Sequence, residues 1–267
     1  MTIMLLKIGQ KYQKHGDLIW AWTNRIVRAR YQQSVLGGLW AIIQPAASVA
    51  IFSIIFTIFV PVNTGEVPYI IFSYVAMVPW TFFSSSISDM VESLVGNMNI
   101  VSKIYFPREV LPVSALLARL VDFFIASIVI VILILYFKVR VSLLGWLFIP
   151  VILLTQIALA LGVGIIGAAL NVFYRDVRHL FALGLQIWFY ASPILYPVSI
   201  VKTKFPTIYY LYYLNPMAGV IEAYRAVLLY QELPGAYLLL SGGVALILLL
   251  FGYWFFKRVE FQFADVI

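Results

Sequence analysis

The sequence contains no cysteine and very few charged residues. Only 11% of its 267 residues are charged, whereas soluble domains average about 25%. The lack of cysteine excludes disulfide bonds, cysteine-ligated metals and thiol nucleophiles. The low charge excludes a soluble protein, because too few polar side chains remain to cover its surface. With 63% hydrophobic residues and a mean hydropathy of +0.99, the chain is predicted to be an all-α integral membrane protein.

The motifs of nucleotide and metal chemistry are also missing. The chain has no G-x-x-x-x-G-K-[ST] phosphate loop, and no glycine precedes a lysine anywhere. It has no H-E-x-x-H motif, and its two histidines, His15 and His179, stand alone in basic segments. We therefore expect no catalytic residue, no metal and no cofactor in this chain. The net charge of +7 is attributed to cytoplasmic loops rather than to nucleic-acid binding.

Long apolar runs predict the spans. A bilayer core of roughly 30 Å is crossed by about 20 apolar helical residues. Six stretches meet this requirement, at about 39–60, 68–88, 113–137, 143–170, 180–201 and 237–256. An even number of spans places both termini on one side of the membrane.

Basic residues indicate which side that is. Twelve of the 18 lysines and arginines lie on the side of the termini and five on the other, although Lys138 and Arg140 run against the trend. The richer side is predicted to be cytoplasmic. We therefore expect a multi-pass membrane protein with both termini in the cytoplasm.

The N-terminal segment 17–36 reads as an amphipathic helix. Leu18, Trp22 and Ile26 share one face, and Asp17 is a plausible N-cap. A basic helix with tryptophan on its apolar face suits a membrane interface. The alternative is an ordinary extension of the first span. We divide the chain into an interface helix (1–36), a six-helix transmembrane domain (37–258) and a cytoplasmic tail (259–267).

The segment 202–236 is apolar but broken by Asn215-Pro216. Two short re-entrant helices at the outer side, between spans five and six, fit this pattern best, since irregular backbone at membrane depth must be buried in protein or line a cavity. The alternative is an amphipathic loop lying on the surface.

The few charged residues near spans allow different readings. Arg119 with Asp122, and Glu222 with Arg225, are spaced to form local ion pairs rather than a proton relay. Asp89 and Glu92 read as a solvated helix end. The abundant aromatic residues suit interfacial belts, and some could instead line a path for sugars. The compact charged connections 99–112 and 171–179 could each form a short helix that docks on a soluble partner.

A series of motifs along nearly the whole chain resembles a known family, the membrane subunits of ABC-2 type polysaccharide exporters. The motifs are Arg30-Tyr31, Ser34-Val-Leu-Gly37, Leu39-Trp40, Gln44-Pro45, Phe106-Pro-Arg-Glu-Val-Leu-Pro112, Asn171-Val172, Arg175-Asp176, Ser192-Pro-Ile-Leu-Tyr-Pro197, Asn215-Pro216 with Glu222 and Arg225, and the tail Glu260–Ile267. Gly38 departs from the pattern, because many relatives have proline there.

The resemblance implies a homodimer with two cytoplasmic ABC ATPase subunits, which would hold the ATP and magnesium. It implies a lipid-linked polysaccharide such as an O-antigen as substrate, within lipopolysaccharide biosynthesis, and contact with membrane lipids. It also implies a location in the bacterial inner membrane. The alternative functions are an ion-coupled secondary transporter and a membrane enzyme that acts on lipid-linked sugars.

Four sets of candidate residues follow. Coupling to the ATPase is assigned to Lys103, Tyr105, Arg108, Glu109, Tyr174, Arg175, Asp176 and Arg178. Uptake of substrate through lipid phosphates is assigned to Arg25, Arg28 and Arg30. The channel aromatics are Tyr31, Trp40, Trp188, Tyr190 and Tyr196. The outer gate comprises Tyr209, Tyr212, Asn215, Pro216, Glu222 and Arg225.

Overall fold

The protein forms a bundle of helices in a computed structural model that describes residues 2–32, 34–103 and 106–264. No β-strand occurs within those ranges. The long helices are α1 (Thr2–Gln32), α2 (Trp40–Ile54), α3 (Tyr69–Ser93), α5 (Val110–Tyr136), α7 (Ile149–Phe173), α8 (Val177–Ala191), α11 (Pro216–Leu229) and α12 (Ala236–Val259). The short ones are η1 (Gly37–Leu39), η2 (Ile55–Phe59), η3 (Val95–Asn97), α4 (Met98–Val101), α6 (Leu143–Trp146), α9 (Val198–Lys204), α10 (Pro206–Tyr212) and η4 (Glu260–Ala264).

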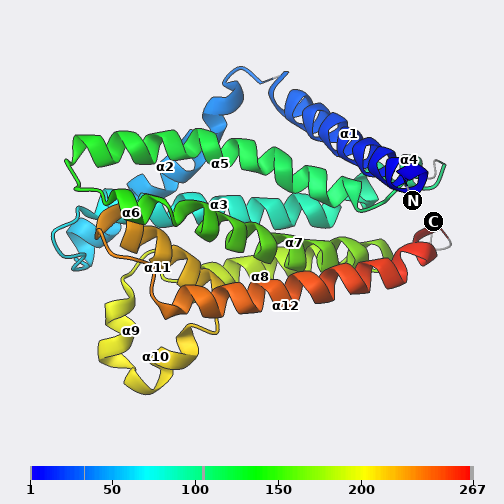
Figure 1. Cartoon of the computed structure of the whole chain (residues 1–267). Coiled ribbons are helices and arrows are strands. Elements are labelled where there is room, and N and C mark those ends of the chain that lie inside the picture. The colour runs from blue at the N-terminus through cyan, green and yellow to red at the C-terminus, as the bar shows by residue number, and fades with distance from the viewer. Residues whose placement is uncertain (1, 33, 104–105, 265–267) are drawn as a thin grey trace.

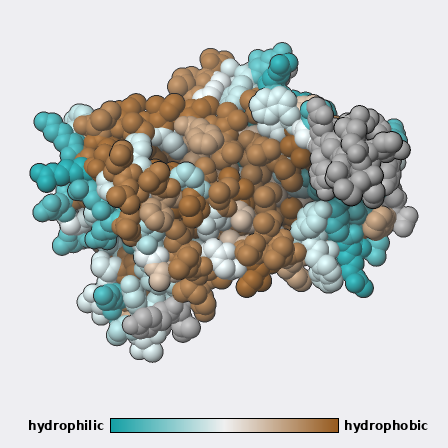
Figure 2. Space-filling model, viewed as in Figure 1, coloured by the Kyte–Doolittle hydropathy of each residue, from teal (hydrophilic) through white to brown (hydrophobic). Residues whose placement is uncertain are grey.

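The start of α1 and the end of α12 lie at the same end of the bundle, which we call the terminal end (Figure 1). Helices α9, α10 and α11 lie toward the other end, which we call the far end (Figure 1). Figure 2 shows an apolar band across the middle of the visible face, with polar residues gathered at both ends. This distribution matches the slab of hydrocarbon that a membrane presents.

Among the residues that the structure describes, five helices are long and apolar enough to cross a membrane. They cover Gly37–Phe59, Tyr69–Ser93, Val110–Tyr136, Leu143–Phe173 and Ala236–Phe263. These coincide with five of the six predicted spans. Large apolar side chains such as Phe124, Ile128 and Ile132 of α5 are exposed. In a soluble protein such a row would be costly, whereas in a membrane it faces lipid.

The remaining predicted span, the fifth, at 180–201, is not one helix. Helix α8 ends at Ala191, and α9 begins only at Val198. Ser192 precedes Pro193 and has extended backbone angles, with φ −103° and ψ 150°. A proline ring clashes with a helical residue before it and cannot supply a backbone N–H, so the Ser192-Pro193 pair stops the helix.

Helix α3 lies at the centre of the bundle, where it packs against α2, α5, α7, α8 and α11. Helices α7 and α12 also form a long contact, in which the two backbones meet directly at two glycines. A Cβ atom on Gly162 would lie 2.6 Å from the carbonyl carbon of Leu248, and one on Gly252 would lie 2.6 Å from the carbonyl oxygen of Gly162. Small residues at helix interfaces allow this backbone-to-backbone packing in membranes.

Helix α1 is longer than the predicted segment 17–36, and it packs along α5. Asp17 lies inside the helix, so its prediction as an N-cap is wrong. Thr23 is buried, Trp22 packs against the core, and the hydroxyl of Ser114 on α5 donates to the carbonyl of Ile19 over 3.1 Å. The side of α1 that contacts the bundle is therefore partly polar. Trp20 of the same helix is exposed and is available to lipid or a partner.

Candidate functional site

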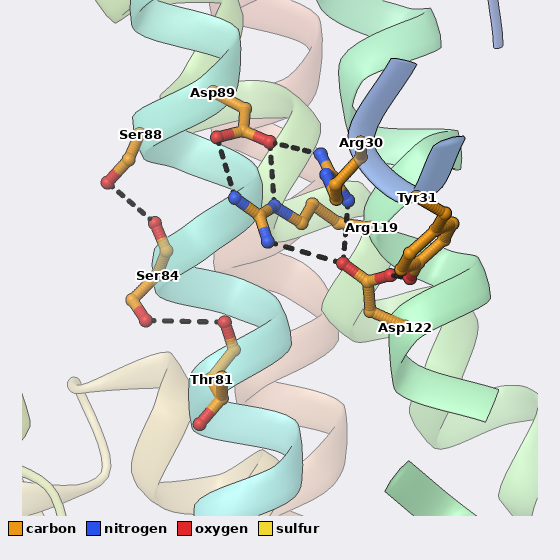
Figure 3. A network of polar contacts seen from close by, with 8 residues as sticks. All are labelled: Arg30, Tyr31, Thr81, Ser84, Ser88, Asp89, Arg119 and Asp122. Carbon is orange, nitrogen blue, oxygen red and sulfur yellow. Dashed lines mark hydrogen bonds and ion pairs between the residues drawn. The ribbon is translucent and has the colours of Figure 1, made fainter. Parts of the chain in front are cut away.

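Two arginines and two aspartates from three helices form a compact cluster toward the terminal end of the bundle. Arg30 comes from the end of α1, Asp89 from α3, and Arg119 and Asp122 from one face of α5 (Figure 3). Arg30 contacts Asp122 at 2.6 Å and Asp89 at 2.8 Å. Arg119 binds both carboxylate oxygens of Asp89, at 2.6 and 3.0 Å, and contacts Asp122 at 3.2 Å. We call these four residues the charge cluster.

The charge cluster is neutral as a whole, since two guanidinium groups face two carboxylates. The four side chains are between 16% and 27% exposed, so the pairs are only partly screened by solvent. The hydroxyl of Tyr31 donates a further hydrogen bond to Asp122. Burial, together with that hydrogen bond, raises the pKa of Tyr31 to about 12. Tyr31 therefore stays protonated at neutral pH and remains a donor to the carboxylate.

The predicted local pair of Arg119 with Asp122 is confirmed. The reading of Asp89 as a solvated helix end is wrong, because Asp89 accepts hydrogen bonds from both arginines of the cluster, whereas Glu92 is exposed. Arg30, grouped with Arg25 and Arg28 for lipid phosphates, is engaged by the two carboxylates. Arg28 is exposed, and Arg25 lies over the ring of Trp22 at 4.5 Å. In the sequence, the cluster was indicated by the opposite charges of Asp89, after the predicted span 68–88, and Arg119, near the start of 113–137.

A row of hydroxyl side chains continues from the charge cluster along α3. It comprises Thr81, Ser84, Ser85 and Ser88, and each is at least partly accessible. Ser88 and Ser84 donate to backbone carbonyls of their own helix, those of Ser84 and Thr81, over 2.9 and 3.4 Å (Figure 3). Their oxygens keep lone pairs for other donors. In an otherwise apolar chain, accessible hydroxyls at membrane depth favour contact with water or a polar ligand.

Segment 99–112 at the terminal end connects to the C-terminal helix. The Nζ atom of Lys257 on α12 contacts Glu109 at 2.9 Å and Glu260 at 3.1 Å, and Arg108 donates to the carbonyl of Glu260. His15 of α1 lies 3.7 Å from Glu109. Of the predicted coupling residues in this segment, Lys103 is exposed and Tyr105 lies outside the described residues.

Segment 171–179 is a tight turn rather than the short docking helix that we expected. Helix α7 ends at Phe173 and α8 begins at Val177, with Asp176 as its N-cap residue. The four coupling residues predicted here, Tyr174, Arg175, Asp176 and Arg178, are all exposed. Beside them lies a cavity of about 290 Å³, lined in part by Glu92 and Asn171. The structure thus brings the turn next to the end of α3.

At the far end, Arg225 binds the segment that interrupts the predicted fifth span. Its side chain is only 1% exposed. Its two terminal nitrogens donate to the carbonyls of Pro193, at 2.5 Å, and Ile194, at 2.8 Å. It pairs with Glu222 at 3.0 Å, which confirms that predicted pair, and its guanidinium lies 3.6 Å from the ring centre of Phe72. Arg225 therefore satisfies backbone oxygens that the break leaves without helical partners.

Asn215 binds the other side of the same break. Its amide nitrogen donates to the carbonyl of Ala191 at 3.1 Å and to the hydroxyl of Ser192 at 3.0 Å. Its amide oxygen accepts from the indole of Trp188 at 2.7 Å and caps α11, which starts at Pro216. Two residues assigned to different predicted sets, a channel aromatic and a gate residue, are thus in contact.

The other predicted aromatic residues fall into two places. Tyr196 and Tyr212 share a hydrogen bond of 3.0 Å, and Tyr196 also donates to the carbonyl of Tyr190. Tyr209 packs edge-on against Tyr213 in the same far-end group. Trp40 begins α2 and is 54% exposed, while Tyr31 is held at the charge cluster. The structure therefore separates Tyr31 and Trp40 from the far-end aromatics.

Comparison with known proteins identifies a matching family and several relatives along most of the chain. Residues 17–229 match the ABC-2 type transporter family. An O-antigen export system permease protein, RfbA, from Klebsiella pneumoniae is 31% identical over 265 residues, which cover 99% of this chain and 100% of the relative. RfbA from Myxococcus xanthus is 30% identical with the same coverage. The polysialic acid transport protein KpsM from Escherichia coli is 26% identical over 210 residues, which cover 75% of this chain and 77% of the relative.

Proposed function

Because the chain belongs to the ABC-2 type transporter family, we propose that it is the permease subunit of an ATP-driven exporter for a lipid-linked polysaccharide. The observation that carries this proposal is the end-to-end match to O-antigen export permeases. Neither alternative, an ion-coupled transporter or a membrane enzyme, is favoured by these relatives. In the proposal, ATP and magnesium bind to a separate ABC ATPase subunit.

We propose six crossings, with α8 as the fifth. Helix α8 has 15 residues and is therefore about 22 Å long, which is shorter than a bilayer core of roughly 30 Å. Five crossings would put α1 and the end of α12 at opposite ends, whereas they lie together (Figure 1). The break at 192–197 completes the crossing, and α9 to α11 turn back at the far end. The basic residues then favour the terminal end as the cytoplasmic one, in a bacterial inner membrane.

The proposed channel lies between two copies of the chain. Helices α2 and α8 contact each other through Phe52 and Phe189, whose ring centres are 6.2 Å apart. Both helices also expose aromatic side chains, with Trp40 at 54% and Tyr190 at 59%. Aromatic faces pack against the apolar faces of sugar rings. A homodimer that joins these surfaces would enclose a path for a glycan, whereas one chain presents only one wall of it.

The exposed turn 174–178 is proposed to receive the movement of the ATPase. The substitution Arg175→Gln, and equally Asp176→Asn, is expected to lower export at least tenfold while the complex still hydrolyses ATP. Because the turn lies on the surface, either substitution removes a contact with the partner and leaves the fold intact. Export and ATP hydrolysis are measured on the same vesicles, with Lys138→Gln as a control at the opposite end. Export at the unsubstituted rate would refute this role.

Arg25 and Arg28 are proposed to recruit the phosphates of the lipid carrier, since basic side chains at a cytoplasmic surface attract anionic headgroups. The double substitution of both residues by glutamine is expected to slow export several-fold, with normal assembly of the complex. The measurement is the amount of lipid-linked glycan left on the cytoplasmic side. If that amount does not rise, the arginines have another role.

Co-purification tests the proposed function as a whole. We would express this chain with the ABC ATPase encoded beside it, purify the complex, and assay ATP hydrolysis and glycan export in membranes. We expect a stable complex with two copies of each subunit, and loss of this chain should leave the glycan inside the cell. Absence of a complex, with transport or chemistry persisting in the isolated chain, would contradict the proposal.

A further inference from the structure

A wide cavity opens at the far end of the bundle, away from the residues that the proposed function uses for coupling and uptake. It has a volume of about 680 Å³ and is formed by four parts of the chain: the α2–α3 connection, Phe72 of α3, α9 with the proline before it, and α11 with the segment that follows it. The residues that matter here are Asn63, Ser199, Lys204, Glu222, Tyr230 and Glu232. We call this cavity the far-end pocket. Its volume falls within the range of about 300–1,000 Å³ that is typical of small-molecule sites.

The far-end pocket offers both donors and acceptors that the described part of the chain leaves without partners. The amide oxygen of Asn63 accepts from the backbone N–H of Gly65 at 2.9 Å, which orients the amide and leaves its NH₂ group to donate. One carboxylate oxygen of Glu222 is bound to Arg225, and the other is left to accept. The side chains of Ser199, Tyr230 and Glu232 add further groups of both kinds.

The charges of the pocket balance. Glu222 is neutralised by Arg225 beneath it, and Glu232 and Lys204 carry opposite charges. An anion such as phosphate would meet two carboxylates, and a metal ion would meet a lysine, with no group of three or more metal-binding side chains in the described ranges. A neutral molecule with many hydroxyl groups suits this lining, because each hydroxyl both donates and accepts.

The walls of the pocket are held in place before any ligand binds. Arg225 fixes Glu222 to the carbonyls of Pro193 and Ile194, and the hydroxyl of Tyr69 donates to the carbonyl of Leu195 at 2.9 Å. Gly65 turns the α2–α3 connection with a φ of +74°, which other residues rarely adopt. A preformed site loses less entropy on binding.

We propose that the far-end pocket binds a neutral sugar unit of the glycan as it leaves the channel. The ring of Tyr230, which is 38% exposed, supplies an apolar surface for the sugar, and Asn63, Glu222 and Glu232 bond to its hydroxyls. This inference rests on the proposed function. It adds a sugar-binding site in each copy of the chain, apart from the aromatic residues assigned to the channel.

The test is ligand binding by the full chain in lipid nanodiscs, measured by isothermal titration calorimetry. The probes are the methyl glycosides of glucose, galactose, mannose, rhamnose and N-acetylglucosamine, together with inorganic pyrophosphate and calcium chloride as ionic probes. We expect at least one glycoside to bind, and Glu232→Gln and Asn63→Ala each to weaken it about tenfold. Glu66→Gln, on the same connection but outside the pocket, is the matched control and should bind as the unsubstituted chain does.

Three results would overturn the inference: no glycoside binds, binding is unchanged in both pocket variants, or only an ionic probe binds with sensitivity to those variants. Association with the ATPase and export of glycan are measured on the same proteins. An exporting complex without sugar binding would refute the pocket and leave the proposed function standing. Sugar binding that depends on Asn63 and Glu232, in a chain that binds no ATPase, would support the pocket and refute the proposed function.

Discussion

Replacing Arg225 with alanine is expected to remove most of the folded protein from the membrane. The substitution leaves Glu222 without its partner and leaves the carbonyls of Pro193 and Ile194 without donors. Loss of one member of a buried ion pair costs about 3–5 kcal/mol, and the uncovered carbonyls add to that cost. In detergent, the apparent Tm should therefore fall by about 6 °C or more.

Two further variants sharpen this prediction. Arg225→Lys keeps the charge but cannot bridge both carbonyls with a planar group, so its Tm should lie between those of the alanine variant and the unsubstituted chain. Lys202→Ala removes an exposed positive charge from the neighbouring helix α9 and should leave the Tm unchanged. The measurement is thermal unfolding followed by size-exclusion chromatography. A Tm for Arg225→Ala equal to that of the control would mean that Arg225 does not hold the break together.

Neutralising both carboxylates of the charge cluster is the second change with a large expected effect. In the double variant Asp89→Asn with Asp122→Asn, Arg30 and Arg119 face each other without compensation. The end of α1 should then separate from α3 and α5, because the ion pairs join these helices there. We expect export to fall at least tenfold while the chain still inserts. Glu66→Gln, which removes an exposed carboxylate from the α2–α3 connection, is the control.

A double-mutant cycle measures the link between α1 and α5 directly. It combines Arg30→Ala and Asp122→Ala, whose side chains are 2.6 Å apart. Residues in one ion-pair network show interaction energies of about 0.5–3 kcal/mol. The double variant should therefore lose less thermal stability than the sum of the losses in the two single variants. Fully additive losses would show that the cluster is a set of independent surface contacts.

The sequence predicted the parts of this fold that depend on composition and length. Helices α2, α3, α5, α7 and α12 appear where long apolar runs occur, because a span needs little more than about 20 apolar residues. The pairs Arg119 with Asp122 and Glu222 with Arg225 were predictable for a similar reason, since three residues separate their members on one helix.

The rest depended on contacts between distant segments. Asp89 and Arg30 are 59 positions apart, and nothing local to either residue showed that α1 would bring them together. The break in the predicted span 180–201 was indicated by Ser192-Pro193, but we gave more weight to the high apolar content of the segment. Arg225 looked like half of a local pair, although it also holds a segment more than 30 residues away.

The close contact of α7 with α12 limits how this protein can change shape. At Gly162 and Gly252 the two backbones meet directly, so neither glycine has a side chain whose rotamers could absorb a displacement there. The two helices should therefore travel as one rigid body in any transport cycle. Hinge motion is left to the elements that pack less tightly, above all α2, which is mostly exposed and touches the bundle mainly through α3 and α5. Opening of the channel would then be a movement of α2 and α8 relative to the rigid pair of α7 and α12.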